Sequence, residues 1–143
     1  MIVLDTNVVS ELSRNRPHVA VQDWFLLAQQ DSRIGLSAMT VAELHDGITR
    51  QPEGTRKRSL WYKLFEVFLP AIRPVVLGFS RAQAEQYGEV NRAARAEGEQ
   101  LSVADAIIAA TCLTHEALLA TRDQQLLRLS ALPTVNPWAF DRR

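Results

Sequence analysis

Four acidic residues are the strongest candidates for chemistry in this sequence, and each stands near the start of a predicted helix. They are Asp5, Glu43, Asp105 and Asp123. Carboxylates crowded together raise one another's pKa values and destabilise a fold unless a cation compensates their charge. Oxygen ligands alone favour Mg²⁺, Mn²⁺ or Ca²⁺ over zinc. If the four acids meet in the folded chain, they indicate a divalent metal site suited to phosphate chemistry.

The same acids also have simpler structural explanations. Asp is a favoured N-cap residue, so Asp5 could cap the helix that follows it. Thr40 with Glu43 matches the capping box, and Ser102 with Asp105 nearly matches it. Acids in a first helical turn also gain about 0.3 to 1 kcal/mol from the helix dipole. For each residue alone, capping competes with metal binding, and only a common location of all four favours the metal.

The elements that must position these acids follow from the apolar pattern. Residues Ile2–Leu4 form an uninterrupted apolar run, which is typical of a short strand buried on both faces of a parallel sheet. Further short strands are predicted at 33–36, 74–77, 117–120 and 133–136. Helical patterns begin near residues 6, 17, 40, 60, 80 and 101, and a short helix follows residue 123. This alternation predicts an α/β fold with a parallel sheet covered by helices on both faces.

That fold would place the acids at one edge of the sheet. Asp5 and Asp123 follow the first and fourth predicted strands, while Glu43 and Asp105 lie near the starts of helices. In open α/β sheets the carboxyl ends of the strands and the starts of the neighbouring helices meet at the same edge, where ligands bind. If strands two, one and four are neighbours, we expect the four carboxylates to face a common crevice.

Length and composition predict one ordinary globular domain covering residues 1–143. Hydrophobic residues make up 47% of the chain and charged residues 22%. Sixteen basic residues balance sixteen acidic ones, so binding to nucleic acid would need a local basic patch. A single cysteine, Cys112, excludes an intrachain disulfide. Without a recognisable signal peptide or membrane-spanning run, the chain is predicted to be cytoplasmic, with no membrane partner.

Two other patterns compete as functional features. The three histidines show no paired ligand spacing with one another or with Cys112, which disfavours a zinc site. A stripe of Leu60, Trp61, Leu64, Phe65 and Phe68 has helical spacing. That spacing favours core packing over a surface for stacking nucleobases. Any part of the stripe left uncovered would be a candidate dimer interface.

Four motifs, taken in order, carry a resemblance to a known family. They are LDTNVVSEL at 4–12, Thr40-x-x-Glu43-Leu44-x-x-Gly47, Asp105-Ala106-x-Ile108-Ala109-Ala110, and Leu119-Ala120-Thr121-Arg122-Asp123. Together they resemble the PIN-domain ribonucleases, particularly the VapC-type toxins of bacterial toxin–antitoxin pairs and their FitB-like branch. The resemblance extends from Ile2 to about Leu127.

The resemblance implies a three-layer α/β/α PIN-like fold whose central parallel sheet has the strand order 3-2-1-4-5. It also implies a Mg²⁺- or Mn²⁺-dependent endoribonuclease that forms a homodimer and is inhibited by a cognate VapB-type antitoxin. By their motif positions, the catalytic and metal-binding acids are Asp5, Glu43, Asp105 and Asp123. The polar residues that support them are Thr6, Asn7 and Thr121.

Three arginines lie near the predicted crevice and could hold RNA phosphates, although ordinary surface roles are an equal alternative. They are Arg14, Arg16 and Arg122.

Two other classes of function compete with the nuclease. One is a non-catalytic PIN-like module that binds RNA or a partner protein. The other is a different Mg²⁺-dependent phosphoryl hydrolase, disfavoured because Asn7 stands where a haloacid-type phosphatase needs its second Asp.

Overall fold

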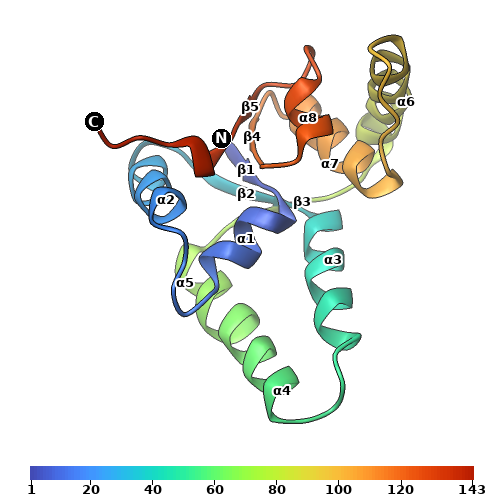
Figure 1. Cartoon of the computed structure of the whole chain (residues 1–143). Coiled ribbons are helices and arrows are strands. Elements are labelled where there is room, and N and C mark those ends of the chain that lie inside the picture. Colours follow the sequence, from blue (N-terminus) through green and yellow to red (C-terminus); the bar gives the residue numbers. More distant parts are fainter.

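A five-stranded sheet forms the centre of the molecule in a computed structural model that describes residues 1–143 (Figure 1). Its strands are β1 (Ile2–Leu4), β2 (Ile34–Ser37), β3 (Val75–Leu77), β4 (Leu118–Ala120) and β5 (Thr134–Val135). The spatial order is β3-β2-β1-β4-β5, and each neighbouring pair is parallel. The predicted parallel sheet and its strand order are confirmed.

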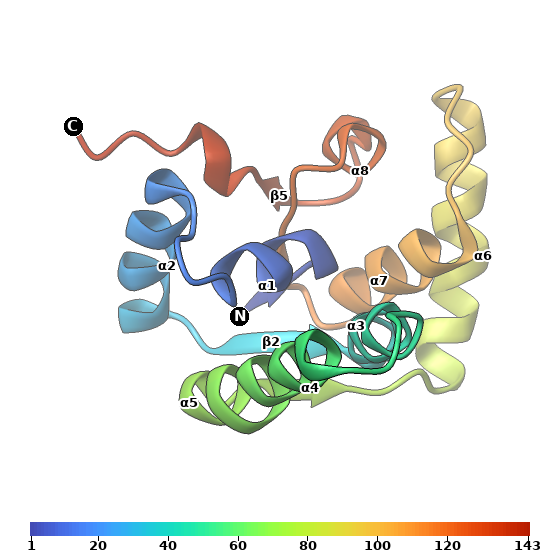
Figure 2. The same cartoon turned by 60° about the horizontal axis from the view of Figure 1, so that its bottom comes forward.

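Helices connect the strands and surround the sheet. They are α1 (Thr6–Leu12), α2 (Val19–Asp31), α3 (Ala38–Thr49), α4 (Thr55–Trp61), α5 (Leu69–Ile72), α6 (Arg81–Ala96), α7 (Val103–Thr114) and α8 (Gln124–Arg128). A π-helical segment, η1 (Tyr62–Phe68), joins α4 to α5, and a 3₁₀ turn, η2 (Pro137–Ala139), follows β5. The loop between α3 and α4 projects away from the sheet, while α2 and α6 lie at opposite ends of the molecule (Figures 1 and 2). None of these helices has the length and apolar character to cross a membrane.

The two faces of the sheet contribute to two hydrophobic cores. Successive side chains of a strand point to opposite faces. Accordingly, Ile2 and Leu4 pack in one core with α1, α2 and α3, while Val3 packs in the other with α6, α7 and α8. All three side chains are buried. The three-layer α/β/α arrangement is therefore confirmed.

Helix α7 is apolar nearly all round, and the structure buries it. Its buried residues are Ala106, Ile108, Ala109, Ala110, Thr111 and Cys112. Burial, with a smaller contribution from the Asp5 charge, raises the pKa of the Cys112 thiol to about 12. The thiol is therefore protonated at neutral pH and contributes packing, because only a thiolate is an effective nucleophile.

The structure corrects three local expectations. Helix α2 begins at Val19 rather than Pro17. In the predicted strand at 33–36, Ile34 and Leu36 alternate with Arg33 and Gly35, yet β2 is buried along its whole length because it lies between β3 and β1 with helices on both faces. The predicted capping box at Thr40 is wrong: α3 begins two residues earlier, where the Ser37 hydroxyl accepts a hydrogen bond from the Met39 amide at 3.2 Å. Thr40 is instead fully buried, and its hydroxyl has no hydrogen-bond partner.

The aromatic stripe on α4 and η1 mainly packs into the core. Leu64 is buried, and Trp61, Phe65 and Phe68 pack partly buried against the first core. The Trp61 and Phe65 rings lie 4.4 Å apart between centroids. Leu60, at the start of the stripe, is 37% exposed. Core packing therefore accounts for most of the stripe and leaves Leu60 at the surface.

Candidate active site at the carboxyl edge of the sheet

Asp5 is the most enclosed of the four acids. It follows β1 directly and is only 4% exposed. Its Oδ1 accepts a hydrogen bond from the Thr6 amide at 2.8 Å, so Asp5 caps α1. Its Oδ2 accepts hydrogen bonds from the Thr121 hydroxyl at 2.6 Å and the Asn7 side-chain amide at 2.7 Å. Asp5 therefore has both roles: it caps α1 through Oδ1 and takes part in a polar site through Oδ2.

The polar residues around Asp5 connect the ends of β1 and β4. The Asn7 amide nitrogen lies 3.3 Å from the Thr121 hydroxyl, while its oxygen accepts from the Arg122 amide at 3.4 Å. The Thr121 hydroxyl also accepts from the Asp123 amide at 3.0 Å. The network therefore fixes both the orientation of Asp5 and the loop that carries Asp123.

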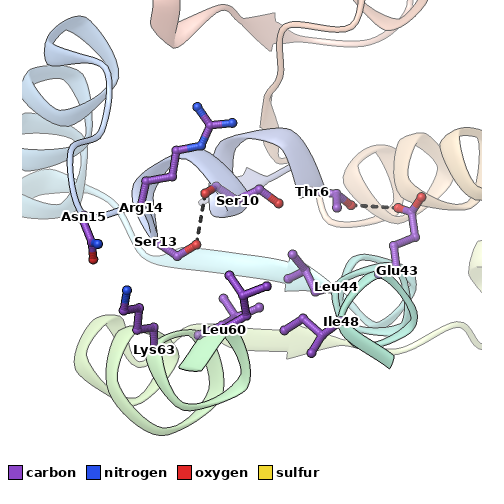
Figure 3. Close-up of a pocket in the computed structure, with 12 residues that line it drawn as sticks. Thr6, Ser10, Ser13, Arg14, Asn15, Glu43, Leu44, Ile48, Leu60 and Lys63 are labelled. Carbon is purple, nitrogen blue, oxygen red and sulfur yellow. Dashed lines mark hydrogen bonds between the residues drawn. The ribbon is translucent and has the colours of Figure 1, made fainter. Parts of the chain in front are cut away.

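Glu43 reaches the site from α3. The Thr6 hydroxyl donates a hydrogen bond to Glu43 Oε1 at 2.8 Å (Figure 3). Because α3 begins at Ala38, Glu43 lies in the second turn and does not cap the helix. Its second carboxylate oxygen has no hydrogen-bond partner, which leaves it available for a ligand.

Asp105 and Asp123 lie at the starts of two further helices. The Ser102 hydroxyl caps α7 by accepting from the Asp105 amide at 3.1 Å, and it donates to Asp105 Oδ2 at 2.7 Å. Asp123 caps α8, since its Oδ1 accepts from the Gln125 and Leu126 amides at 2.8 and 3.1 Å. Each of the two acids keeps one carboxylate oxygen without a hydrogen-bond partner.

The four carboxylates affect one another electrostatically. Burial is the main reason that the pKa of Asp5 lies above its ordinary value of 3.8. The charges of Asp105 and Glu43 raise it further, while hydrogen bonds from Thr121 and Thr6 oppose the shift. The pKa of Asp105 is also raised, mainly by burial and additionally by the Asp123 charge, against the lowering effect of Ser102. These mutual effects link all four acids in one region.

None of the four acids forms an ion pair with a basic side chain. The structure contains eight ion pairs, and all of them join other residues. The four carboxylates without ion pairs, and their free oxygens, match the donor chemistry that Mg²⁺ and Mn²⁺ prefer. As they stand, no three His, Cys, Asp or Glu side chains are gathered closely enough to hold a metal ion. The residues therefore fit such an ion by chemistry and charge, without a preformed ligand cluster.

The three arginines occupy different environments. Arg14 pairs with Glu11 at 3.1 Å and lines a pocket beside Glu43. The Arg122 guanidinium lies 4.7 Å from the centre of the Trp138 ring, a cation–π contact that the sequence pattern did not predict. Arg16 is exposed. Of the three, only Arg14 lines the pocket that adjoins the acids.

Comparison with known proteins gives consistent results. A family model described as PIN domain matches residues 2–132. The chain is 39% identical to the VapC ribonuclease Y4jK of Sinorhizobium fredii over 96% of this chain and 98% of that protein. It is 36% identical to Toxin FitB of Neisseria gonorrhoeae over 96% and 99% of the two chains. The crystal structure of FitAcB from Neisseria gonorrhoeae matches with a TM-score of 0.85 and 35% identity, covering 98% of this chain and 100% of that one.

Proposed function

The chain belongs to the PIN-domain family, among the VapC-type toxins, and we propose that it is a Mg²⁺- or Mn²⁺-dependent endoribonuclease. We further propose that residues 1–143 form one such domain and act as the toxin of a type II toxin–antitoxin pair. The observation that carries the enzymatic proposal is the group of four carboxylates, none of them in an ion pair, at the carboxyl edge of the sheet. A protein that only bound RNA would gain nothing from such a group, because carboxylates repel phosphates.

Each polar residue has a separate task in this proposal. Bound Mg²⁺ or Mn²⁺ would supply an activated water and stabilise charge that develops on the phosphate. Asp5 would be the most rigid ligand, since Asn7 and Thr121 fix its carboxylate. Thr6 orients Glu43 through its hydroxyl. The remaining ligands would be the unbonded oxygens of Asp105 and Asp123.

The test of endonuclease activity is the conversion of a circular single-stranded RNA to linear products by the purified protein in Mn²⁺. We expect linear RNA of full length to appear first, because a cut inside the chain opens the circle. An exonuclease needs an end and would leave the circle intact. Retardation of the circle on a native gel without any opening would contradict the proposal and favour a non-catalytic binding module.

We also propose that the protein forms a homodimer and binds a cognate VapB-type antitoxin. This proposal is supported by the match to the FitAcB structure over 98% of this chain and by the 36% identity to Toxin FitB, a relative whose name identifies it as a toxin. Co-expression with the product of a short neighbouring reading frame should yield one complex that co-elutes and no longer opens circular RNA. Light scattering should give the free protein a mass near twice 16.1 kDa. A monomer at tens of micromolar would contradict the dimer, and unchanged cleavage in the complex would contradict the antitoxin.

A further inference from the structure

A pocket of about 460 Å³ opens directly beside Glu43, and none of the catalytic tasks assigned above uses it. Its walls come from α1, the loop after α1, α3, α4 and η1. Thr6 and Glu43 form one end, whereas Arg14, Asn15 and Lys63 lie at the other (Figure 3). The volume is within the range of about 300 to 1,000 Å³ that is usual for ligand pockets.

The end distant from Glu43 carries positive charge. Arg14 is held in place by Glu11, whose side chain is only 7% exposed, while the Arg14 side chain itself is 63% exposed. Lys63 is half-buried and forms no ion pair or hydrogen bond, unlike Lys57 on the preceding turns, which pairs with Glu53. A half-buried lysine buries its apolar stem and keeps its ammonium in water, so the unpaired Lys63 ammonium is free to bind an anionic ligand at this end.

Between the two ends the pocket has an apolar floor. Leu44, Ile48 and Leu64 are 5%, 8% and 5% exposed, and Leu60 is 37% exposed at the rim. Leu60, Lys63 and Leu64 follow the i, i+3, i+4 spacing and therefore face the pocket together from one side of α4 and η1. The pocket thus offers an acidic end, an apolar middle and a basic end in sequence.

We propose that this pocket binds the RNA nucleotide next to the cleaved bond. In this arrangement the base covers the apolar floor, and Lys63 and Arg14 bind the flanking phosphate. The inference rests on the proposed nuclease function, which places the cleaved phosphate at the Glu43 end. RNA fits because each of its repeating units carries an apolar base face, which suits the floor, and a phosphate, which suits the cations. The floor and the cations follow one another in the same order. Phosphate contacts of this kind position a strand without reading its sequence.

The test uses Lys63→Gln and Arg14→Gln with a fluorescent single-stranded RNA. Binding is measured by anisotropy in EDTA at several salt concentrations, and cleavage is measured in Mn²⁺. Each variant should raise KM about three- to tenfold and leave kcat near the wild-type value, since the lost contact is equal in ground and transition states. The slope of log affinity against log salt should fall by about 0.7 for each cation removed.

Two further variants serve as controls. Lys63→Arg keeps the charge and should restore binding, whereas Arg56→Gln removes an exposed charge of α4 outside the pocket and should behave as wild type. Because Lys63 has no partner, its replacement leaves no buried charge behind, so Lys63→Gln should melt at the wild-type temperature. This makes Lys63 the cleaner probe, since removal of Arg14 leaves Glu11 unpaired.

The outcomes separate this inference from the proposed function. If Lys63→Gln matches Arg56→Gln in affinity and salt slope, the RNA subsite is wrong even when the wild type cleaves RNA. If the variants lose affinity for the antitoxin but keep wild-type RNA binding, the pocket is a protein-binding site and the inference is overturned. If RNA binding falls as expected and no preparation cleaves RNA, the nuclease function fails, and with it the placement of this nucleotide next to a cleaved bond.

Discussion

The Asp5→Asn protein is expected to lose cleavage of circular RNA by at least about 100-fold, the upper range seen for groups that only support a metal ligand. Asp5 is the acid most firmly oriented by its neighbours, because three hydrogen bonds converge on its two oxygens. Asn has a similar shape, keeps one oxygen for the Thr6 amide and remains a good N-cap. Its NH2 group cannot accept the hydrogen bonds that Asn7 and Thr121 donate to Oδ2, so the loss would reflect both the missing charge and these two missing contacts. Initial rates in Mn²⁺ measure it.

In EDTA at neutral pH, we expect Asp5→Asn to be as stable as the wild type or slightly more stable. The folded-state pKa of Asp5 is raised, chiefly by burial. Its contribution to folding is therefore fully present below the unfolded pKa of about 3.9 and is lost as the pH rises through the folded pKa. Asn does not titrate, so the variant loses no stability through this position as the pH rises. The stability advantage of the variant should grow with pH over this window and vanish in acid, and melting curves at a series of pH values check the sign.

Added Mn²⁺ should stabilise the wild type more than Asp5→Asn, which is opposite in sign to the stability difference expected in EDTA. A ligand that binds only the folded state stabilises it by about 2.7 kcal/mol at one hundred times its Kd. The wild type should gain melting temperature in millimolar Mn²⁺, and Asp5→Asn should gain much less. Asp46→Asn is the matched control, because Asp46 is an exposed acid of α3 that pairs with Arg50. Equal Mn²⁺ shifts in wild type and Asp5→Asn would remove Asp5 from the set of metal ligands.

Removal of divalent metal is expected to abolish cleavage by the wild-type protein. Without a cation, the four carboxylates would repel the phosphate that must approach them. Activity should return on adding Mg²⁺ or Mn²⁺ to protein stripped with EDTA, whereas Zn²⁺ should restore it poorly because it prefers nitrogen and sulfur ligands. Undiminished cleavage by metal-free protein would overturn the proposed mechanism.

Most of the fold could be predicted from local patterns. The apolar run at Ile2–Leu4 predicts a strand buried on both faces, and the nearly uniform apolar character of α7 predicts a buried helix. Both features depend on composition along a short stretch, which the sequence displays directly. The parallel sheet follows because strands and helices alternate. The strand order came from the resemblance to the PIN-domain family, since local patterns do not specify which strands pair.

The boundaries of elements were harder to predict. The sequence predicts Thr40 as the N-cap of α3, but β2 pairs with β3 through Ser37 and the helix begins directly after the strand. The consequence for the site is direct, because Glu43 then lies one turn further along the helix. There it accepts from the Thr6 hydroxyl instead of closing a capping box.

By itself, the sequence determined which residues can do chemistry: four acids, each next to the start of a helix, with polar neighbours in the motifs around Asp5 and Thr121. Only the tertiary structure decided how they are connected. Asp5 and Thr121 are separated by 116 positions and share a hydrogen bond of 2.6 Å, because β1 and β4 pair in parallel and end together. The Arg122–Trp138 contact and the pocket between Glu43 and Lys63 also depend on long-range packing. Such contacts produce no periodic pattern in the sequence, because their partners come from different elements.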